Sequence, residues 1–182
     1  MGSAKDELKQ LVIEKALRHG DFTLTSGAKS TYYIDGKQIT LDAHGARLVG
    51  EVIFEAIEDL KADAVGGLTL GADPIATAVA IASDYKQAPI PAFIVRKGAK
   101  AHGTMRRIEG PIKPRSKVAI VEDVVTKGGS ALEAAAAVEE EGHSVTAIIC
   151  LVDRLQGGGE AIGEAGYEFR PLFTIEELGV SR

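Results

Sequence analysis

The stretch that decides the fold reads Val118-Ala119-Ile120-Val121-Glu122-Asp123-Val124-Val125-Thr126-Lys127-Gly128-Gly129-Ser130-Ala131. Its first four residues form a short apolar run, which predicts a buried strand. Two adjacent carboxylates follow, and after them comes a short turn of small and polar residues that opens a helix. A strand, a turn and a helix in this order form the unit from which α/β folds with a parallel sheet are built.

The turn from Thr126 to Ser130 predicts an anion site. Small residues at a helix N-terminus leave backbone N–H groups free, and the helix dipole adds positive potential, so a phosphate is the natural occupant. Glu122 and Asp123 can accept hydrogen bonds from sugar hydroxyls. A plain strand, turn and helix with capping residues is the alternative, but two carboxylates are poor neighbours for a bare phosphate loop. The pattern therefore favours one ligand with both a phosphate and a diol, a ribose 5-phosphate.

The rest of the chain alternates between short apolar strands and helices. The expected strands are 64–70, 91–95, 117–121, 144–152 and 168–173. The expected helices are an N-terminal one that Ser3 caps with Asp6 and Gly20 stops, one with its apolar stripe over 48–57, one starting at Asp73-Pro74 with Asp73 as its cap, and 130–141. This alternation predicts an α/β fold with a parallel sheet covered by helices on both faces. Residues 21–40 indicate a hairpin or an irregular hood. We expect a single domain over residues 1–182, with a small N-terminal hood formed mainly by about residues 1–40.

Composition excludes several classes of protein. With 21 Lys and Arg against 26 Asp and Glu, the net charge of −5 gives no global field that attracts nucleic acid or an anionic membrane. No run approaches the roughly 20 apolar residues of a membrane span, and the N-terminus lacks the apolar core of a signal peptide, so we expect a cytoplasmic protein. The single cysteine, Cys150, excludes an internal disulfide and is expected to be buried.

Residues 96–107 form a basic segment in this acidic protein. It holds five Lys or Arg side chains and His102 within 12 residues, with glycines that allow movement. A solvated surface loop is the ordinary interpretation of such a charge run. Because this segment follows a predicted strand, where sites in open α/β sheets lie, we expect a mobile cationic lid. Such a lid would stabilise a diphosphate leaving group.

The stretch from Val118 to Ala131 closely resembles the signature of the type I phosphoribosyltransferases, in which an acidic pair and two aliphatic residues precede Thr-x-Gly-x-Ser. The resemblance implies that Glu122 and Asp123 hold the ribose hydroxyls of phosphoribosyl pyrophosphate (PRPP), and that Asp123 is catalytic. It assigns the 5-phosphate to the loop, so the residues expected to bind PRPP there are Val124, Val125, Thr126, Lys127, Gly128, Gly129 and Ser130. Lys127 departs from the small residue that is commonest at its position.

The basic segment is similar to the loop of one branch of this family, the orotate phosphoribosyltransferases, through Arg96-Lys97-x-x-Lys100-x-His102-Gly103. There the loop of one subunit reaches into the neighbour's site. The resemblance therefore implies a homodimer in which loop 96–107 completes the neighbour's site. It makes Lys100 and His102 catalytic and PRPP-binding residues that act in trans, joined by Arg96 and Lys97 in binding PRPP. Arg106 and Arg107 lie outside the motif and are given no role.

Thr25 to Asp35 resembles the hood of the same branch. Tyr33 and Ile34 match positions that lie against orotate, although a simple hairpin is the alternative interpretation. Thr126 is also expected at the orotate site. Val152-Asp153-Arg154 ends a predicted strand, and a planar guanidinium suits a carboxylate or a ring carbonyl, so we expect Arg154 to contact orotate. The alternative for Arg154 is a surface pair with Asp153.

Gly66 to Pro74 matches the family's pyrophosphate loop in position, which implies that the backbone at Leu70 and Gly71 binds PRPP. Some members carry lysines where this chain has Thr25 and Gly71, so what supplies those contacts is open. Asp73 is expected either to cap a helix or to bind metal-held water.

The resemblance implies transfer of the 5-phosphoribosyl group from PRPP to orotate, giving orotidine 5'-monophosphate and diphosphate in pyrimidine biosynthesis. The implied cofactor is Mg²⁺, held by substrate oxygens and water with few or no direct protein ligands. No nucleic acid or membrane partner is expected. A purine phosphoribosyltransferase is one alternative, but it would lack the hood and the Lys100-x-His102 pair. A non-catalytic PRPP sensor that binds nucleic acid is the other, and the acidic balance and short length count against it.

Overall fold

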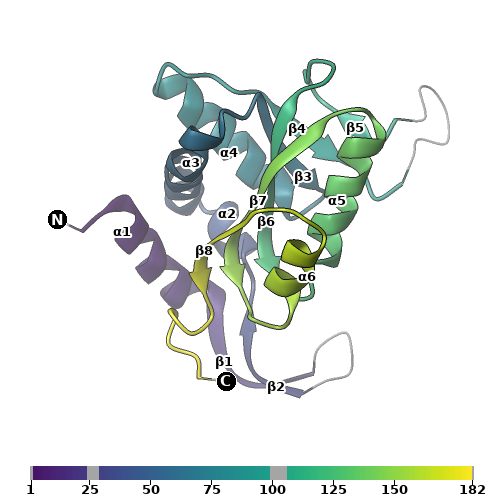
Figure 1. The fold of residues 1–182 in the computed structure, drawn as a ribbon. Helices are drawn as coiled ribbons and strands as arrows, with labels where there is room; N and C mark the ends of the chain where they lie inside the picture. Colours follow the sequence, from purple (N-terminus) through teal and green to yellow (C-terminus); the bar gives the residue numbers. More distant parts are fainter. Residues whose placement is uncertain (1, 24–28, 99–105, 182) are drawn as a thin grey trace.

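The computed structural model describes residues 2–23, 29–98 and 106–181. Within them, the main sheet has the strand order β5-β4-β3-β6-β7-β8 (Figure 1). The strands are β3 (Ala64–Leu68), β4 (Ala92–Val95), β5 (Ile108–Glu109), β6 (Lys117–Val125), β7 (Ser144–Asp153) and β8 (Phe169–Thr174). All pairings are parallel except that of β5 with β4. The predicted α/β class and parallel sheet are confirmed, and the antiparallel edge strand is an addition that the sequence did not indicate.

Helices cover both faces of the sheet, as expected. One face carries α3 (Ala43–Ile57) and α4 (Ala72–Tyr85), and the other carries α5 (Gly129–Glu140) and α6 (Gly158–Glu164). The side chains of β6 alternate between two cores. Ala119 and Val121 pack into the cluster with α3 and α4, whereas Val118 and Ile120 pack into the cluster with α5. This period of two is the geometry of a strand that is buried on both faces.

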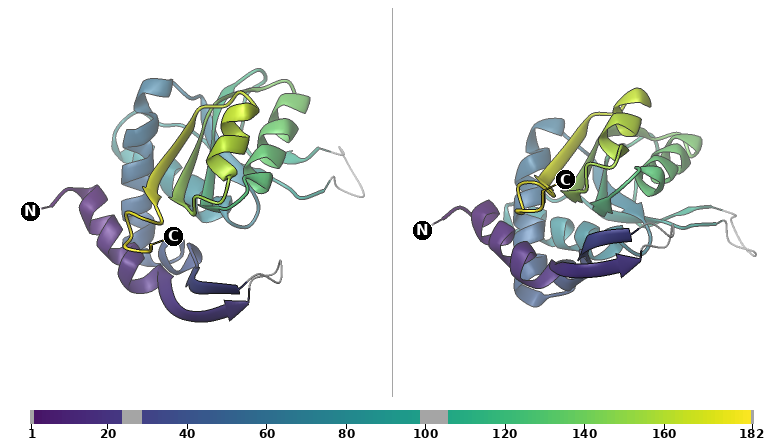
Figure 2. Two further views of the ribbon diagram at one scale, coloured as in Figure 1. Left: turned by 60° about the horizontal axis from the view of Figure 1, so that its bottom comes forward. Right: turned by 90° about the horizontal axis from the view of Figure 1, so that it is seen from below.

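The N-terminal region forms a hood across one end of the sheet. It consists of α1 (Ala4–Leu11), a π-helical segment (Val12–Ala16), β1 (Leu17–Thr23), β2 (Lys29–Ile34) and α2 (Lys37–Thr40). The strands β1 and β2 pair antiparallel, so the hairpin interpretation is confirmed. Figures 1 and 2 show this hairpin beyond the end of the sheet toward which β6 and β7 point. Binding sites of open α/β sheets lie at that end.

Two predicted helix ends were wrong. The first helix does not continue to Gly20, because the chain becomes extended at Leu17 and pairs there with Ile34 of β2. This long-range pairing overrides the local helical pattern. The helix expected to begin at Asp73 begins at Ala72 with Gly71 as its N-cap, so Asp73 lies in the first turn and is not the cap.

The end predicted for the central strand was also wrong. β6 continues to Val125 instead of ending at Val121, because it pairs with β7 as far as Asp153. The acidic pair Glu122 and Asp123 therefore lies inside the strand and not in a loop after it. The helices α2 and α6 were not predicted.

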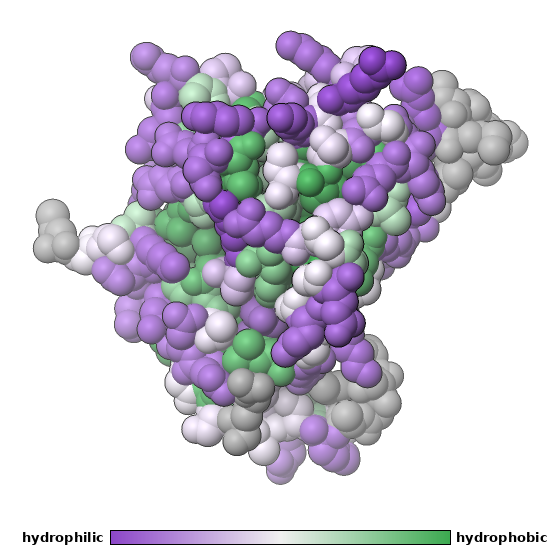
Figure 3. Space-filling view, viewed as in Figure 1, coloured by the Kyte–Doolittle hydropathy of each residue, from purple (hydrophilic) through white to green (hydrophobic). Residues whose placement is uncertain are grey.

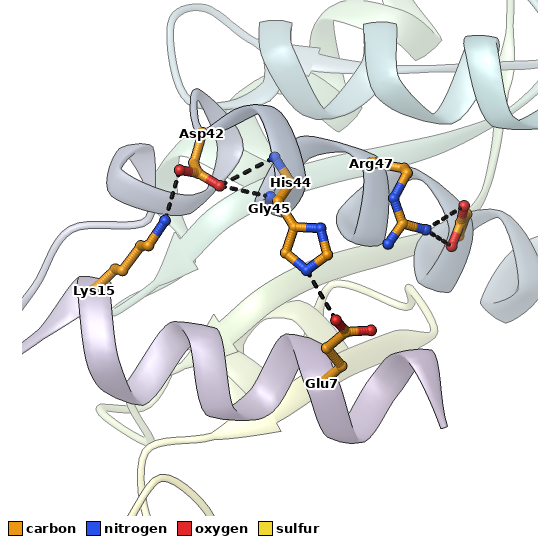
Figure 4. Close-up of polar contacts among 7 residues, drawn as sticks. Glu7, Lys15, Asp42, His44, Gly45 and Arg47 are labelled. Carbon is orange, nitrogen blue, oxygen red and sulfur yellow. Dashed lines mark hydrogen bonds and ion pairs between the residues drawn. The ribbon is translucent and has the colours of Figure 1, made fainter. Parts of the chain in front are cut away.

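Polar contacts fix the N-terminal segment to α3 (Figure 4). Asp42 caps α3 by accepting hydrogen bonds from the backbone N–H groups of His44 at 3.1 Å and Gly45 at 2.9 Å. Its other carboxylate oxygen lies 2.7 Å from the ammonium of Lys15, and His44 Nε2 lies 2.9 Å from Glu7 Oε1. Exposed ion pairs contribute only about 0–1 kcal/mol each, so they orient the segment while its apolar side chains hold it.

Hydrophilic side chains cover most of the face drawn in Figure 3, and apolar ones show in scattered patches between them. In the described part of the chain, no helix combines the length and the apolar character needed to cross a bilayer. Cys150 is fully buried, as predicted, and burial raises the pKa of its thiol well above the ordinary value. The residue therefore belongs to the core.

Gly66 allows a test of how closely β3 packs against Phe93 of β4. A Cβ atom at Gly66 would lie 2.3 Å from the carbonyl oxygen of Phe93 and 2.6 Å from its ring. We expect Gly66→Ala to lower the thermal unfolding midpoint, because overpacking a core typically costs about 1–3 kcal/mol. Gly163→Ala is the control, since nothing lies within 4 Å of a Cβ there. Equal midpoints for the two variants, measured by circular dichroism, would contradict this packing.

Candidate active site

A cavity of about 850 Å³ opens where β6 ends. It is lined by Arg18, Phe22, Thr23, Tyr33, Val124, Val125, Thr126, Lys127, Gly128, Gly129, Ser130, Arg154 and Gln156. The structure thus brings the predicted phosphate loop, the hood residue Tyr33 and the strand-end residue Arg154 to one place, although they are up to 121 positions apart in the chain. The cavity combines an anion site, an aromatic side chain and a guanidinium.

The turn 126–130 has the geometry of an anion site. It connects β6 to α5, whose N-cap Gly128 has a φ of 78°, a conformation that favours glycine. Among the described residues, no side chain caps this helix. The first N–H groups of a helix have no partner inside the helix, so those of α5 are available to a ligand at the cavity wall.

The acidic pair is buried beside this turn. Glu122 and Asp123 are each only 7% exposed. Asp123 Oδ1 accepts a hydrogen bond from the N–H of Val124 at 2.9 Å, and Asp123 Oδ2 accepts one from the ammonium of Lys37 at 2.8 Å. Glu122 Oε1 accepts from the N–H of Asp123 at 3.2 Å. The two carboxylates are thus fixed by the strand backbone and by one cation from α2.

Burial changes the protonation of the pair. It raises the pKa of Glu122 to about 8, with the neighbouring Asp123 carboxylate as the second cause. The hydrogen bond to Asp123 raises the pKa of Lys37, so this ammonium stays charged. A protonated Glu122 beside an Asp123 that is paired with a cation keeps the net charge of this acidic pair low.

The turn between β3 and α4 lies against the acidic pair. A Cβ atom at Gly71 would come within 2.6 Å of Glu122 Oε1 and 2.7 Å of Asp123 Oδ1. Leu70 is 73% exposed, and the peptide bond that precedes it is cis. The predicted PRPP contacts at Leu70 and Gly71 therefore adjoin the carboxylates, on a wall separate from the 126–130 turn.

Arg154 is a buried cation that faces the cavity. Its side chain is 7% exposed, so the alternative of a surface pair with Asp153 was wrong. The Nε–H donates to the hydroxyl of Tyr32 at 3.3 Å, and the guanidinium lies 4.9 Å from the centre of the Tyr32 ring. Nη2 is buried with no hydrogen-bond partner among the described residues. A buried guanidinium with an open donor is suited to an anionic ligand.

The two hood residues predicted to bind orotate, Tyr33 and Ile34, lie in different environments. Tyr33 lines the cavity and packs on Phe22, with 5.7 Å between their ring centres. The side chain of Ile34 is buried in the core and does not line the cavity. Sequence reasoning missed Arg18 as a lining residue because it placed Arg18 on a helix. It also missed Gln156, whose only signal was its place two residues after Arg154.

The basic segment is only partly described. Arg96 contacts Glu109 at 3.5 Å and is half-buried, whereas Lys100, His102 and the hood position Thr25 lie outside the described residues. Arg107 donates to the carbonyl of Arg96 at 3.0 and 3.1 Å and pairs with Glu133, so it has a structural contact in the base of the segment.

Protein ligands for a metal are sparse in this region. No group of three or more His, Cys, Asp or Glu side chains in the described ranges is arranged to hold a metal ion. Asp73 Oδ2 accepts from the Thr69 hydroxyl at 2.7 Å, and its buried Oδ1 has no partner among the described residues. Oδ1 could accept a hydrogen bond from a metal-held water.

The pKa of Glu122 makes stability depend on pH. A carboxyl whose folded-state pKa is raised contributes stability below its ordinary pKa of 4.5, and this contribution is lost as the pH rises toward about 8. We expect wild type to lose more stability than Glu122→Gln between about pH 5 and pH 8, because glutamine does not ionise. Urea unfolding measures this, with the exposed Glu164→Gln as control. If the free energy of unfolding changes with pH in the same way for wild type and Glu122→Gln, the claim that Glu122 is protonated in the folded protein is wrong.

Comparison with models of protein families finds no match. An orotate phosphoribosyltransferase from a Nostoc species is 46% identical over 179 residues, which cover 98% of this chain and 86% of the relative. A solved structure of the Mycobacterium tuberculosis orotate phosphoribosyltransferase with Fe(III) dicitrate is 42% identical, with a TM-score of 0.88 over 98% of this chain and all of that one. A PRPP complex of the same enzyme is 37% identical, with a TM-score of 0.85 and the same coverage of both chains. The chain therefore belongs to the orotate phosphoribosyltransferase family and has the type I phosphoribosyltransferase fold.

Proposed function

We propose that the cavity at the end of β6 is where this orotate phosphoribosyltransferase moves the 5-phosphoribosyl group from PRPP to orotate. The products are orotidine 5'-monophosphate and diphosphate, in pyrimidine biosynthesis. The observation that carries the assignment is the buried acidic pair directly ahead of the uncapped start of α5, in a strand whose end lines the same cavity as Arg154. This arrangement suits a sugar phosphate next to an anionic acceptor.

For the donor, we assign the 5-phosphate to the backbone N–H groups and hydroxyls of the turn 126–130. The ribose hydroxyls donate to Glu122 and Asp123, whose positions are fixed by the strand. The diphosphate then extends toward Leu70 and Gly71, because Gly71 adjoins both carboxylates. Arg96, Lys97, Lys100 and His102 are proposed to neutralise it.

For the acceptor, Arg154 is the proposed partner of orotate. Its unpartnered Nη2 suits the carboxylate or a ring carbonyl of orotate. Tyr33 from the hood and Thr126 from the turn line the same cavity and would contact the pyrimidine. Since the Ile34 side chain is in the core, only its backbone could contribute to this site.

The proposed reaction is a displacement at the anomeric carbon. The bond from C1 to the diphosphate oxygen breaks and its electron pair leaves with diphosphate. The N1 atom of orotate bonds to C1, its N1–H bond breaks, and the proton passes to an oxygen of the departing diphosphate or to water. Fixed hydroxyl contacts at Glu122 and Asp123 orient the ribose, and Asp123 lies where positive charge develops on the sugar. Lys100 and His102 are proposed to stabilise the departing diphosphate.

Mg²⁺ is the proposed cofactor, and the donor set fits it. Mg²⁺ keeps several waters and binds substrate phosphates readily, so few direct protein ligands are needed. Asp73, through the unpartnered Oδ1, is the residue that would hold a metal-bound water. When bound, the ion supplies charge neutralisation at the diphosphate.

We also propose a homodimer in which loop 96–107 completes the neighbour's site. An apolar face supports it, because Ile81 and Tyr85 are 55% and 84% exposed beside the groove between α3 and α4. Such a face is typical of an interaction surface. We further propose that the chain acts as one domain, because Leu8 of α1 shares a core cluster with the sheet. A cytoplasmic location suits substrates that are anions, and we propose no nucleic acid or membrane partner.

The direct test follows orotate consumption by absorbance. We expect consumption only with both PRPP and Mg²⁺, and loss of it when the metal is chelated. Adenine, guanine and xanthine in place of orotate should give no product. Product from a purine, or orotate loss that does not need PRPP, would contradict the proposal.

Arg154→Met tests the acceptor site. We expect the KM for orotate to rise by about tenfold or more, since a hydrogen bond to a charged group is worth roughly 1.5–3 kcal/mol. The dissociation constant for Mg·PRPP, measured by calorimetry, should stay close to that of wild type. The exposed Arg115→Met is the control. An unchanged KM for orotate would remove Arg154 from the acceptor site.

Mixed variants test the dimer. Lys100→Ala and Asp123→Ala each inactivate a different part of the composite site, so each alone should have little activity. A mixed dimer regains one complete site if the loop acts across subunits, and random mixing then restores up to about a quarter of wild-type activity. No recovery after subunit exchange, with mixed dimers shown by native mass spectrometry, would contradict action in trans.

A further inference from the structure

Lys37 occupies a position that the reaction as described does not explain. It is the first residue of α2, and its ammonium lies 2.8 Å from Asp123 Oδ2. No other ion pair among the described residues involves Glu122 or Asp123. The Lys37 side chain is 45% exposed while that of Asp123 is 10% exposed, so the lysine approaches the buried acid from the solvent side.

The backbone holds Lys37 in this place. The N–H of Lys37 donates to Asp35 Oδ1 at 3.1 Å, and the N–H of Asp35 donates to the carbonyl of Ala16 at 3.1 Å. The preceding Gly36 lies so close to the acid that a Cβ there would be 2.8 Å from the Cβ of Asp123. The start of α2 is therefore packed directly on Asp123, and the ammonium can change partners through rotation of the Lys37 side chain without movement of this backbone.

Covalent geometry places the diphosphate near this ammonium. The hydroxyl on C2 of the ribose is adjacent to C1, which carries the diphosphate. If Asp123 accepts hydrogen bonds from the ribose hydroxyls, the first phosphate, which C1 carries, lies next to the hydroxyl that contacts Asp123. It is therefore close to the carboxylate that Lys37 contacts. Lys37 also lines a groove with Leu70 and Asp73, on the wall assigned to the diphosphate.

The charge of Asp123 favours a cation at this point. A diphosphate beside the Asp123 carboxylate is repelled, and the Gly71 backbone offers no side chain to offset this. Gly71 has no room for one, because a Cβ there would meet both carboxylates. The ammonium of Lys37 can offset the repulsion from the opposite side, and its hydrogen bond to Asp123 keeps it charged by raising its pKa.

We propose that Lys37 is a PRPP-binding residue that exchanges partners. In the empty site its ammonium pairs with Asp123, and when the ribose hydroxyls take over Asp123 the ammonium moves to the diphosphate oxygens. This rests on the proposed function, since it takes the acidic pair as the ribose site. Lys37 then supplies from α2 a positive charge that the turn at Leu70 and Gly71 lacks.

Calorimetry with two ligands tests the exchange. Lys37→Met should weaken binding of Mg·PRPP by about tenfold or more, as expected for the loss of a charge-assisted hydrogen bond. Ribose 5-phosphate lacks the diphosphate, so its affinity should be unchanged or higher once the competing ion pair is gone. Lys37→Arg should recover most of the PRPP affinity.

Lys15→Met is the matched control, because Lys15 is 44% exposed and pairs with Asp42 at 2.7 Å (Figure 4). Neither Lys15 nor Asp42 lines the cavity at the end of β6 or the groove that Lys37 lines. Lys37→Gln, checked for a wild-type unfolding midpoint, gives a second neutral variant. If the affinities for PRPP and for ribose 5-phosphate change by the same factor, or if neither affinity changes, Lys37 is only a partner of Asp123 and the exchange is overturned. If wild type binds neither ligand, the proposed function itself fails and the exchange with it.

Discussion

The pairing of β6 with β7 through Val125 and Asp153 is the constraint on which the site depends. It keeps β6 extended past its apolar run, so the two carboxylates are held by strand backbone. It also fixes Arg154, the residue that follows β7, because the N–H of Arg154 donates to the carbonyl of Val125 at 2.9 Å. One ladder thus sets the distance between the acidic pair, the turn 126–130 and the Arg154 guanidinium, the groups that we propose bind the sugar, the phosphate and the acceptor.

The same ladder buries charges that would be more stable in water. Glu122, Asp123 and Arg154 are each 7% exposed, and burial of a charged group is unfavourable unless it is paired. Asp123 has Lys37 as its partner, Glu122 is favoured in its protonated form, and Arg154 retains one unpartnered donor. We propose that the substrates satisfy these groups and that part of the binding energy comes from these contacts.

The sequence predicted the fold class because its signal is local. Apolar runs, glycines and the stretch from Val118 to Ala131 indicated the alternation of strands and helices and the place of the turn 126–130. Boundaries set by distant partners were missed: β6 extends to Val125 because of β7, and β1 begins at Leu17 because of β2. The contact of Lys37 with Asp123 joins residues 86 positions apart, so no local pattern could reveal it.

The central claim is that the acidic pair and the turn 126–130 together hold one phosphoribosyl group. A crystal structure of the protein with Mg·PRPP tests this most directly. The account predicts the 5-phosphate within hydrogen-bond distance of the N–H groups of residues 126–130, with the ribose hydroxyls on Glu122 and Asp123. A sugar bound elsewhere, with both carboxylates free of it, would contradict the account.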